Sequence, residues 1–188
     1  MRPLALMQLL TIVWLASEFI VFRRDLQPKS GTRRDVGSRL ALFAGIGLGF
    51  FVAVQAVAQH LVPLPGPGAA WMMAGTMLAI AGMLYRQYAV RWLGAFFRTQ
   101  VTLLDDHRLI TDGPYARLRH PTYSGALLTC VGIGLVTGSL IALAAMVGLP
   151  LIAFAYRIRI EERALAEHFG AAWSAYRERT AALIPGLW

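Results

Sequence analysis

Charged residues are scarce in this sequence. Asp, Glu, Lys and Arg together make up only 15% of its 188 residues, whereas 57% are hydrophobic. A soluble domain carries about a quarter charged residues and is about half apolar. With a mean hydropathy of +0.55, the chain has more apolar surface than a small core can bury, which indicates a protein embedded in lipid.

Cysteine is almost absent as well. The one cysteine, Cys130, lies inside an apolar run, which excludes a disulfide framework and a cysteine-based metal site. No metal cofactor is expected. A cleavable signal peptide is not expected either, because the first apolar stretch is too long for a signal-peptide core and ends at Arg23-Arg24 without a small-x-small cleavage pattern.

The sequence contains long apolar stretches with few or no charges. About 20 apolar residues are needed to cross a bilayer as a helix. Residues 4–22, 40–59 and 69–88 meet that length with at most one charge each. They are the first three predicted spans.

A fourth apolar stretch, residues 123–156, contains no charge at all. It is too long for one span, and Thr137-Gly138-Ser139 offers a turn in its middle. We therefore predict an all-α, polytopic membrane protein of five transmembrane helices, with the last two forming a tight hairpin over roughly 123–137 and 140–157. Four spans is the alternative.

Basic residues alternate with the predicted spans. Lys and Arg are concentrated in residues 23–39, in 86–122 and in the tail from residue 157, whereas residues 60–68 and the hairpin turn contain none. Because basic loops remain in the cytoplasm, we predict that the N-terminus is outside and that the three basic segments, with the C-terminus, are cytoplasmic. Topology thereby accounts for the net charge of +8, and no nucleic-acid partner is expected.

The cytoplasmic tail shows helical periodicity. Its large apolar residues, Leu165, Phe169, Trp173 and Tyr176, recur every three or four positions, and its charged residues fall between them. This pattern predicts an amphipathic helix that lies against the membrane or the cytoplasmic face of the bundle. Gly170 is expected to mark a bend or a close contact in it.

Polar residues concentrate in two stretches beside the hairpin, 98–123 and 157–163. In the first, Asp112-Gly113-Pro114 is a turn signal, and His120-Pro121 indicates an extended residue before a helix start. Such a start presents the His120 ring and free backbone amides, which suit a carboxylate. A connector of this length is more often functional than passive.

The second stretch places Arg157 and Glu161 four residues apart on one helix face. Taken alone, this pair is as consistent with an interfacial anchor as with a functional site. Glu18 is a further acidic residue, within the first span. An intramembrane carboxylate is a functional candidate, but its position near the cytoplasmic end favours a packing or interfacial role.

The two stretches together form a specific pattern. Gly113-Pro114-Tyr115 and Arg119-His120-Pro121-Thr122-Tyr123-Ser124-Gly125 precede the hairpin, and Glu161-Glu162, Leu165, Phe169-Gly170, Trp173 and Tyr176 follow its apolar part. Over about residues 98–188 the chain resembles the isoprenylcysteine carboxyl methyltransferase family and its relatives among the phospholipid methyltransferases. The resemblance implies an enzyme that uses S-adenosyl-L-methionine, with residues 1–97 as a three-span scaffold and 98–188 as the catalytic half.

The resemblance also implies roles for single residues. The cofactor would contact Gln100, His107, Arg108, Leu109, Ile110, Tyr115, His120, Pro121, Thr122, Tyr123 and Glu161. Arg157 would bind the substrate and, with Glu161, form the catalytic pair. The choice between Glu161 and Glu162 stays open, because this chain has Arg159 and Arg163 where the family often has a longer acidic run.

The methyl acceptor decides what chemistry is needed. The carboxylate of a prenylated cysteine or a similar lipophilic acid is already a nucleophile, so the protein has to align and desolvate it while Arg157 orients the anion. Such an acceptor would reach the site sideways from the bilayer. The oligomeric state is left open.

Three alternatives remain. An amine acceptor, as in phospholipid N-methylation, would need a base such as Glu161, Glu162 or His107, and Arg157 would repel it. A reductase of isoprenoid or sterol double bonds would need nicotinamide contacts, and the sequence shows no Gly-rich phosphate cradle. A structural or interaction protein would have no need of the binding motifs.

Overall fold

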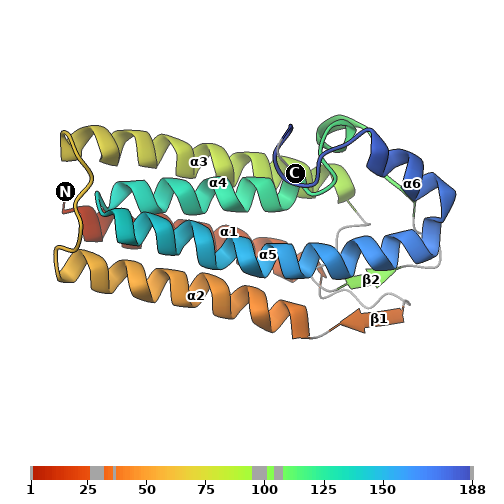
Figure 1. Ribbon diagram of the computed structural model, residues 1–188, viewed down its shortest axis with the longest axis horizontal. Helices are drawn as coiled ribbons and strands as arrows, with labels where there is room; N and C mark the ends of the chain where they lie inside the picture. The colour runs from red at the N-terminus through yellow and green to blue at the C-terminus, as the bar shows by residue number, and fades with distance from the viewer. Residues whose placement is uncertain (1, 26–31, 36, 95–100, 104–107, 187–188) are drawn as a thin grey trace.

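The computed structural model describes residues 2–25, 32–35, 37–94, 101–103 and 108–186. The long helices of this part of the chain run alongside one another (Figure 1). They are α1 (Pro3–Asp25), α2 (Gly37–Ala58), α3 (Gly68–Leu93), α4 (Pro121–Val136) and α5 (Leu140–Phe169). Two short helices, the 3-10 helix η2 (Gly113–Ala116) and α6 (Ala171–Glu178), lie together at one end of the bundle.

Each predicted apolar run forms a helix. By length and composition, α1, α2, α3 and α5 can cross a membrane, and they leave large apolar side chains exposed, among them Phe19, Phe43, Leu84 and Ile152. In water such exposure forgoes about 25 cal/mol for each Å² left unburied, whereas lipid solvates it. α4 has only 16 residues and is largely covered by the other helices. The helical prediction is confirmed, with four long candidate spans and one shorter apolar helix.

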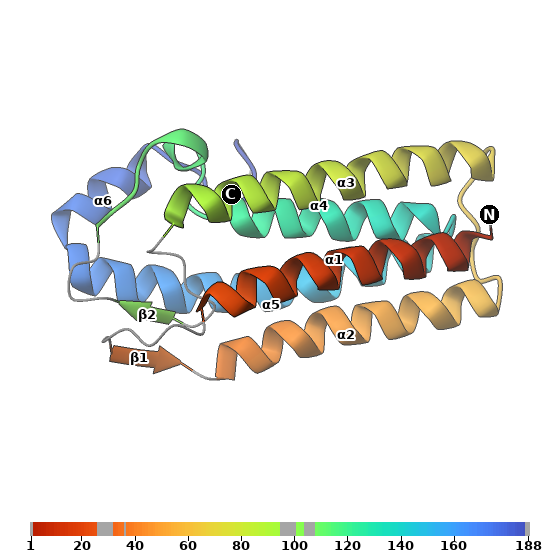
Figure 2. The same ribbon diagram turned by 180° about the vertical axis from the view of Figure 1, so that it is seen from behind.

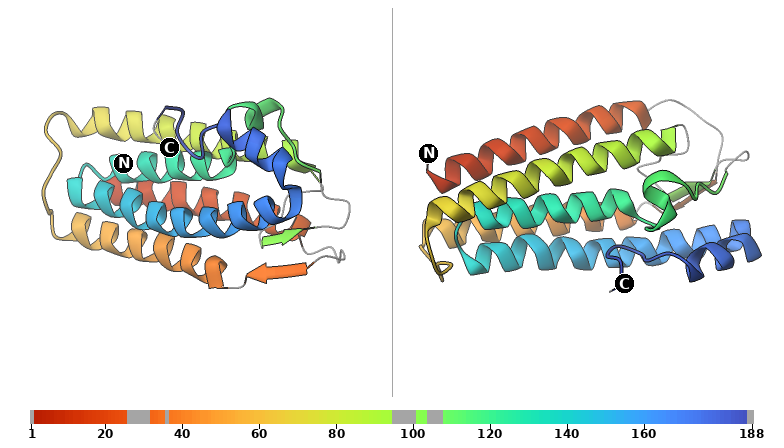
Figure 3. Two further views of the ribbon diagram at one scale, coloured as in Figure 1. Left: turned by 45° about the vertical axis from the view of Figure 1, so that its right-hand side comes forward. Right: turned by 90° about the horizontal axis from the view of Figure 1, so that it is seen from above.

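α4 and α5 occupy the middle of the bundle. α3 packs against α4, and α2 packs along α5. Seen from behind, α1 lies in front, between α3 and α2 (Figure 2), and seen from above, α1 and α5 lie on opposite sides (Figure 3). The buried core between the helices includes Trp14, Cys130, Ile133, Met146 and Ile158.

Glycines allow α3 and α4 to approach closely. A Cβ atom added to Gly82 of α3 would lie 2.5 Å from the amide nitrogen of Thr129 in α4. One added to Gly75 would lie 2.5 Å from the carbonyl oxygen of Gly132. Small residues at such contacts are the usual means by which membrane helices pack tightly. α4 is therefore held firmly against α3.

The predicted hairpin turn is confirmed. α4 ends at Val136 and α5 begins at Leu140, and Gly138 between them has a φ of +66°, which favours glycine because it has no Cβ. The side chain of Ser139 caps α5 by accepting a hydrogen bond from the amide of Ala142, and its hydroxyl donates to the carbonyl of Leu61 at 2.6 Å. The turn is thus tied to the connection between α2 and α3.

The tail differs from the sequence-based expectation in where its helix begins. α5 continues without interruption for 30 residues, so Leu165 and Phe169 belong to it and not to a separate helix. The break comes at Gly170, which has a φ of +51°, and α6 follows. Trp173 and Tyr176 of α6 are buried against the polypeptide, and the Tyr176 hydroxyl donates to the carbonyl of Tyr115 at 2.8 Å.

A short β-ribbon, absent from the all-α prediction, joins two connecting segments. β1 (Thr32–Asp35) pairs antiparallel with β2 (Val101–Leu103), with Thr32 opposite Leu103 and Asp35 opposite Val101. Both strands lie at the same end of the bundle (Figure 1). Two extended segments side by side satisfy their amide and carbonyl groups by pairing with each other.

The C-terminal segment holds the start of α4. The amides of Arg119 and His120 donate to the carbonyls of Ala181 and Ala182 at 2.8 and 3.0 Å. The Ser124 hydroxyl donates to the carbonyl of Leu183 at 2.6 Å. The residues before and after the beginning of α4 are therefore fixed by main-chain partners from the far end of the chain.

Candidate active site

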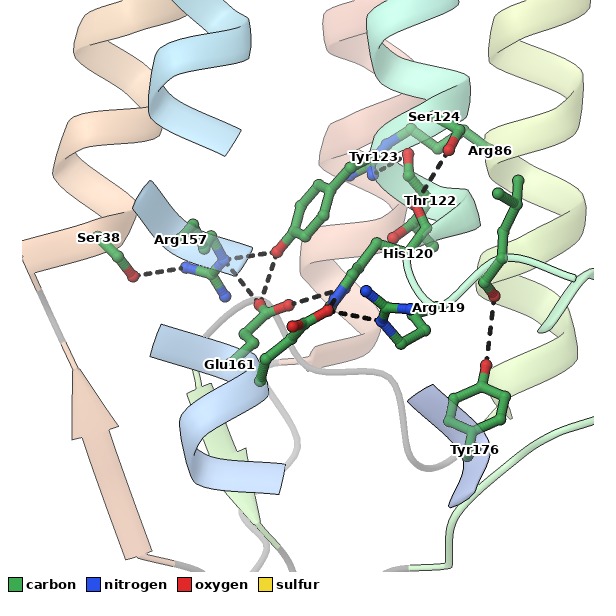
Figure 4. Close-up of polar contacts among 12 residues, drawn as sticks. Ser38, Arg86, Arg119, His120, Thr122, Tyr123, Ser124, Arg157, Glu161 and Tyr176 are labelled. Atoms are coloured by element: carbon green, nitrogen blue, oxygen red, sulfur yellow. Dashed lines mark hydrogen bonds and ion pairs between the residues drawn. The ribbon is translucent and has the colours of Figure 1, made fainter. Parts of the chain in front are cut away.

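Polar side chains from α2, α4 and α5 converge where α4 begins (Figure 4). His120 is the residue before the first turn of α4, and Tyr123 lies within that turn. Arg157 and Glu161 lie on the facing side of α5, four residues apart. Because Pro121 needs no amide partner, it suits the first helical position and allows His120 to leave the helix axis.

Arg157 is the centre of this cluster. Its side chain is 1% exposed, and its Nε donates to Glu161 Oε1 at 2.9 Å and to the Tyr123 hydroxyl at 2.6 Å. The Tyr123 hydroxyl in turn donates to the same carboxylate oxygen at 2.6 Å. A cation, a phenol and a carboxylate thus form a closed triangle between α4 and α5. Charge-assisted bonds of this kind are about twice as strong as neutral ones.

A third helix contributes to the same guanidinium. Arg157 Nη1 donates to the hydroxyl of Ser38 at 3.2 Å, and Ser38 is fully buried near the start of α2. A buried guanidinium requires partners for its several N–H groups. Ser38 supplies one of them from the opposite side to Glu161 (Figure 4).

His120 lies between two carboxylates. Its Nδ1 is 3.5 Å from Glu161 Oε2, and its Nε2 is 3.3 Å from Glu162 Oε1. Glu162 Oε1 also accepts from Arg119 Nε at 2.7 Å. The two glutamates between which the sequence could not decide are therefore both in the site, joined through one imidazole ring.

The pKa of His120 is raised above its ordinary value of 6.5. Burial by itself lowers this pKa, because a charged imidazolium loses its water. Hydrogen bonds that Glu161 and Glu162 accept from the ring, together with the attraction of their charges, outweigh the effect of burial. The two carboxylates therefore stabilise the protonated form of the His120 ring.

Four of the residues implied by the family resemblance thus come together: His120, Tyr123, Arg157 and Glu161. Pro121 and Thr122 are buried beside them at the start of α4. The Thr122 carbonyl accepts from Arg86 Nη1 at 3.1 Å.

The other implied residues lie outside the cluster. Tyr115 is buried, and its hydroxyl donates to the carbonyl of Ala89 in α3 at 3.4 Å. Arg108 is exposed, and Leu109 and Ile110 are half-buried, in the stretch that leads to η2. Gln100 and His107 were also implied in cofactor binding, and they lie outside the described residues.

Some of the backbone amides that were expected to be free at the start of α4 are hydrogen-bonded within the protein. The amides of Tyr123 and Ser124 both donate to the carbonyl of His120, at 3.0 and 3.1 Å. The His120 ring also faces carboxylates. A ligand carboxylate at this point therefore meets less free hydrogen-bonding capacity than the sequence indicated, and more negative charge.

The sequence did not predict the roles of two residues of the site. Ser38 lies 119 residues before Arg157, in a helix interpreted as scaffold, and nothing in the sequence marks it. Arg119 was visible in the motif, but its role as the partner of Glu162 was not assigned. The i, i+4 spacing of Arg157 and Glu161 was the signal that identified their contact in advance.

The arrangement can bind ligand groups of both signs. Arg119 and Arg157 supply two positive charges against two negative charges from Glu161 and Glu162, and His120 adds a third positive charge in its protonated form. An anion can be oriented by Arg157, while a cation can approach the carboxylate oxygens that carry fewer bonds, such as Glu161 Oε2. Within the described ranges, no group of three or more His, Cys, Asp or Glu side chains could hold a metal ion.

Comparison with known proteins gives consistent matches. The model of the isoprenylcysteine carboxyl methyltransferase family matches residues 74–167. Protein-S-isoprenylcysteine O-methyltransferase B of Arabidopsis thaliana is 28% identical over 188 residues, 98% of this chain and 93% of that protein. The uncharacterized protein YpbQ of Bacillus subtilis is 26% identical over 84% of this chain and 93% of its own length. The structure of the eukaryotic intramembrane Ras methyltransferase, an isoprenylcysteine carboxyl methyltransferase, aligns with a TM-score of 0.59 at 25% identity, over 79% of this chain and 52% of that chain.

Proposed function

The chain belongs to the isoprenylcysteine carboxyl methyltransferase family, and from that premise we propose that it methylates the carboxylate of a prenylcysteine-like lipophilic acceptor with S-adenosylmethionine as the methyl donor. The protein is an integral, multi-pass membrane methyltransferase. The observation that carries the proposal is the buried Arg157–Glu161–Tyr123 triangle beside His120, which lies within the residues that the family model matches.

The donor set of the site fits S-adenosylmethionine. Glu161 Oε1 is occupied by Arg157 and Tyr123, whereas Oε2 has, among the residues that the structure describes, only His120 as a partner, at 3.5 Å. It therefore keeps the capacity to accept from an ammonium group. The half-buried side chains of Leu109 and Ile110 offer apolar contact for an aromatic ring, and Gln100, His107, Arg108 and Tyr115 complete the proposed binding residues. When bound, this cofactor supplies a methyl group on a positively charged sulfur.

Arg157 is proposed to bind the acceptor. A carboxylate needs no general base, since it is already deprotonated at neutral pH. The guanidinium fixes its direction, and the surrounding burial removes water from the attacking oxygen. Ser38 and Tyr123 keep the guanidinium in place from two sides. Arg157 also argues against an amine acceptor, because a buried fixed cation repels an ammonium group.

His120 is proposed to act on the cofactor mainly through Glu161. A protonated ring held between Glu161 and Glu162 fixes both carboxylates and keeps them ionised. Pro121, Thr122 and Tyr123 contribute as the turn that holds this ring. A direct contact of His120 with a ligand carboxylate would require its ring to leave one of the glutamates.

The topology forms part of the proposal. With the short helix α4 counted as a span, the five spans place the N-terminus outside and the site in the cytoplasm, in keeping with the basic segments. Residues 1–97 would act as scaffold and 98–188 as the catalytic half, with α6 as an amphipathic helix on the cytoplasmic face. Ser38 is one of the points at which the scaffold half reaches the site. The acceptor would approach from the bilayer between helices.

The direct test is methyl transfer by the detergent-solubilised protein. The donor is S-adenosylmethionine with a radiolabelled methyl group, and the acceptor is S-farnesylcysteine with an acetylated amine. We expect a labelled product whose label is released as methanol by base, as a methyl ester requires. The same acceptor with a carboxamide in place of its carboxylate is the matched control and should remain unlabelled.

Calorimetric titration with S-adenosylhomocysteine tests the cofactor part separately. We expect saturable binding that His120→Ala and Glu161→Ala abolish, and that Arg159→Ala leaves unchanged. Arg159 is an exposed cation two positions from Arg157, so it controls for the loss of a charge on α5. Absence of binding by the unaltered protein would overturn the proposal, whereas base-stable label in phosphatidylethanolamine would replace the acceptor by an amine.

A further inference from the structure

Glu18 of α1 and Arg86 of α3 form an ion pair between two of the apolar helices. Arg86 Nη2 donates to Glu18 Oε2 at 2.6 Å, and Arg86 Nε donates to Glu18 Oε1. The indole of Trp14 donates to the same Oε1 atom at 3.2 Å. A guanidinium that makes two bonds to one carboxylate is a strongly directional contact. The pair therefore fixes how α1 and α3 lie relative to each other at this level of the bundle.

The same arginine reaches the start of α4. Arg86 Nη1, the nitrogen that Glu18 does not engage, donates to the carbonyl of Thr122 at 3.1 Å. One turn further along α4, Gly125 lies directly against Arg86, since a Cβ atom there would be 2.7 Å from the Arg86 amide nitrogen. Arg86 thus touches α4 with its backbone and with its side chain, on both sides of Tyr123.

Stability alone is a weak reason for such a pair. The side chains of Arg86 and Glu18 are only 13% and 27% exposed, and the desolvation of two charges largely offsets their attraction. Ionisable residues inside membrane spans are functional candidates for this reason. In this structure the pair has a direct connection to the site, because Arg86 Nη1 bonds to Thr122, the residue between Pro121 and Tyr123.

We propose that Glu18 and Arg86 are positioning residues for the active site. Glu18 orients the Arg86 guanidinium, and Arg86 holds the first turn of α4 so that Tyr123 points at Arg157 and Glu161. This inference rests on the proposed function and adds α1, which lies on the opposite side of the bundle from α5 (Figure 3), to the parts of the chain that set the geometry of the chemistry.

The geometry that depends on this support is tight. The Tyr123 hydroxyl is 2.6 Å from both Arg157 Nε and Glu161 Oε1, so a small rotation of the first turn breaks both bonds. A misplacement of about 1 Å in a catalytic group can reduce the rate on the order of a hundredfold. Loss of the Glu18 charge leaves Arg86 free to turn away from the Thr122 carbonyl, and a partial effect on the rate follows.

A double-mutant cycle in the methyl-transfer assay tests this coupling. The variants are Glu18→Gln, Tyr123→Phe and the combination of the two, with kcat and KM measured for donor and acceptor. We expect Glu18→Gln to lower kcat about tenfold, and to lower it less than about twofold when Tyr123 is already Phe, because residues that act as one unit give non-additive effects. Ser17→Ala is the control, since within the described part of the chain the Ser17 hydroxyl bonds only to the carbonyl of Trp14 in its own helix.

The outcomes separate cleanly. An equal loss of kcat from Glu18→Gln in both backgrounds, or no loss at all, overturns the positioning role while leaving the methyltransferase intact. If the unaltered protein transfers no methyl group, the proposed function itself fails. Should Glu18→Gln not yield folded protein, Arg86→Lys replaces it in the cycle, because lysine keeps the charge but lacks the fork that reaches both Glu18 and Thr122.

Discussion

Among substitutions in the site that keep the shape of the side chain, Glu161→Gln should lower the stability of the protein the most. Glutamine has the same shape but no charge. It removes the anion that Arg157, Tyr123 and His120 share, at 2.9, 2.6 and 3.5 Å. The buried Arg157 cation then remains with one counter-charge fewer, and the His120 ring loses one of its two carboxylate neighbours.

The magnitude follows from burial. Breaking a buried ion pair by removing one partner costs about 3–5 kcal/mol. Glutamine retains an oxygen that can still accept from Arg157, and the Glu161 side chain is 19% exposed, so the lower end of that range applies, about 3 kcal/mol. For a chain of this size each kcal/mol corresponds to about 2–4 °C in the unfolding midpoint, which gives a decrease of about 6–12 °C.

Thermal unfolding of the detergent-solubilised protein, followed by circular dichroism, measures this decrease. Glu178→Gln is the matched control, because Glu178 is an exposed carboxylate at the end of α6, and its midpoint should equal that of the unaltered protein. Binding of S-adenosylhomocysteine should be lost in Glu161→Gln at temperatures where the variant is still folded.

The double variant Arg157→Met, Glu161→Gln provides the decisive comparison. Removal of both charges leaves no unpaired ion between them, so the double variant should unfold at a higher temperature than the sum of the two single decreases implies. If the two decreases simply add, or if Glu161→Gln unfolds within a degree of the unaltered protein, the two side chains do not act as a buried pair.

Three further predictions follow from other parts of the molecule. The raised pKa of His120 contributes stability that is complete below about pH 6.5 and is lost as the pH rises through the higher folded pKa. The unfolding midpoint should therefore decrease as the pH is raised above that range. This decrease should be smaller in His120→Gln. Gly132→Ala forces a methyl group into the α3 backbone and should cost about 1–3 kcal/mol in denaturant unfolding, whereas Gly148→Ala, with nothing within 4 Å, should be neutral or stabilising. Tyr176→Phe removes the hydroxyl that bonds two buried carbonyls and should lower the free energy of unfolding by about 1–3 kcal/mol; in the unaltered protein, absorbance titration should show a tyrosine with a pKa of about 12, raised by burial.

The helices and the hairpin were predictable because local composition determines them. An uncharged run of sufficient length has to be a helix in lipid, since its amides and carbonyls find no other partners there. Thr137-Gly138-Ser139 was predictable as a turn because its residues favour one. The contact of Arg157 with Glu161 followed from helical spacing alone.

The contacts between helices were not predictable in the same way. Which face of α2 meets α5 decides whether Ser38 reaches Arg157, and a helix that is apolar all round gives no indication of its rotation. Glu18 and Arg86 were each conspicuous as charges inside apolar runs, yet their pairing depends on α1 lying beside α3. The β-ribbon depends on two connections meeting at one end of the bundle, and only the assembled helices determine that.

The pairing of the C-terminal segment with the start of α4 sets the order in which the enzyme can mature. Leu183 follows Ser124, its hydrogen-bonding partner, by 59 residues, and Ala182 accepts the amide of His120. At a synthesis rate of about 5–20 residues per second, these partners are synthesised about 3–12 seconds after the start of α4. During that interval the inserted helices can already bind lipid, but the turn that carries His120 is not yet held. A nascent chain therefore passes through a membrane-bound stage in which its helices are formed but the start of α4 is not yet held, and the site becomes complete only after the segment around Leu183 has been synthesised.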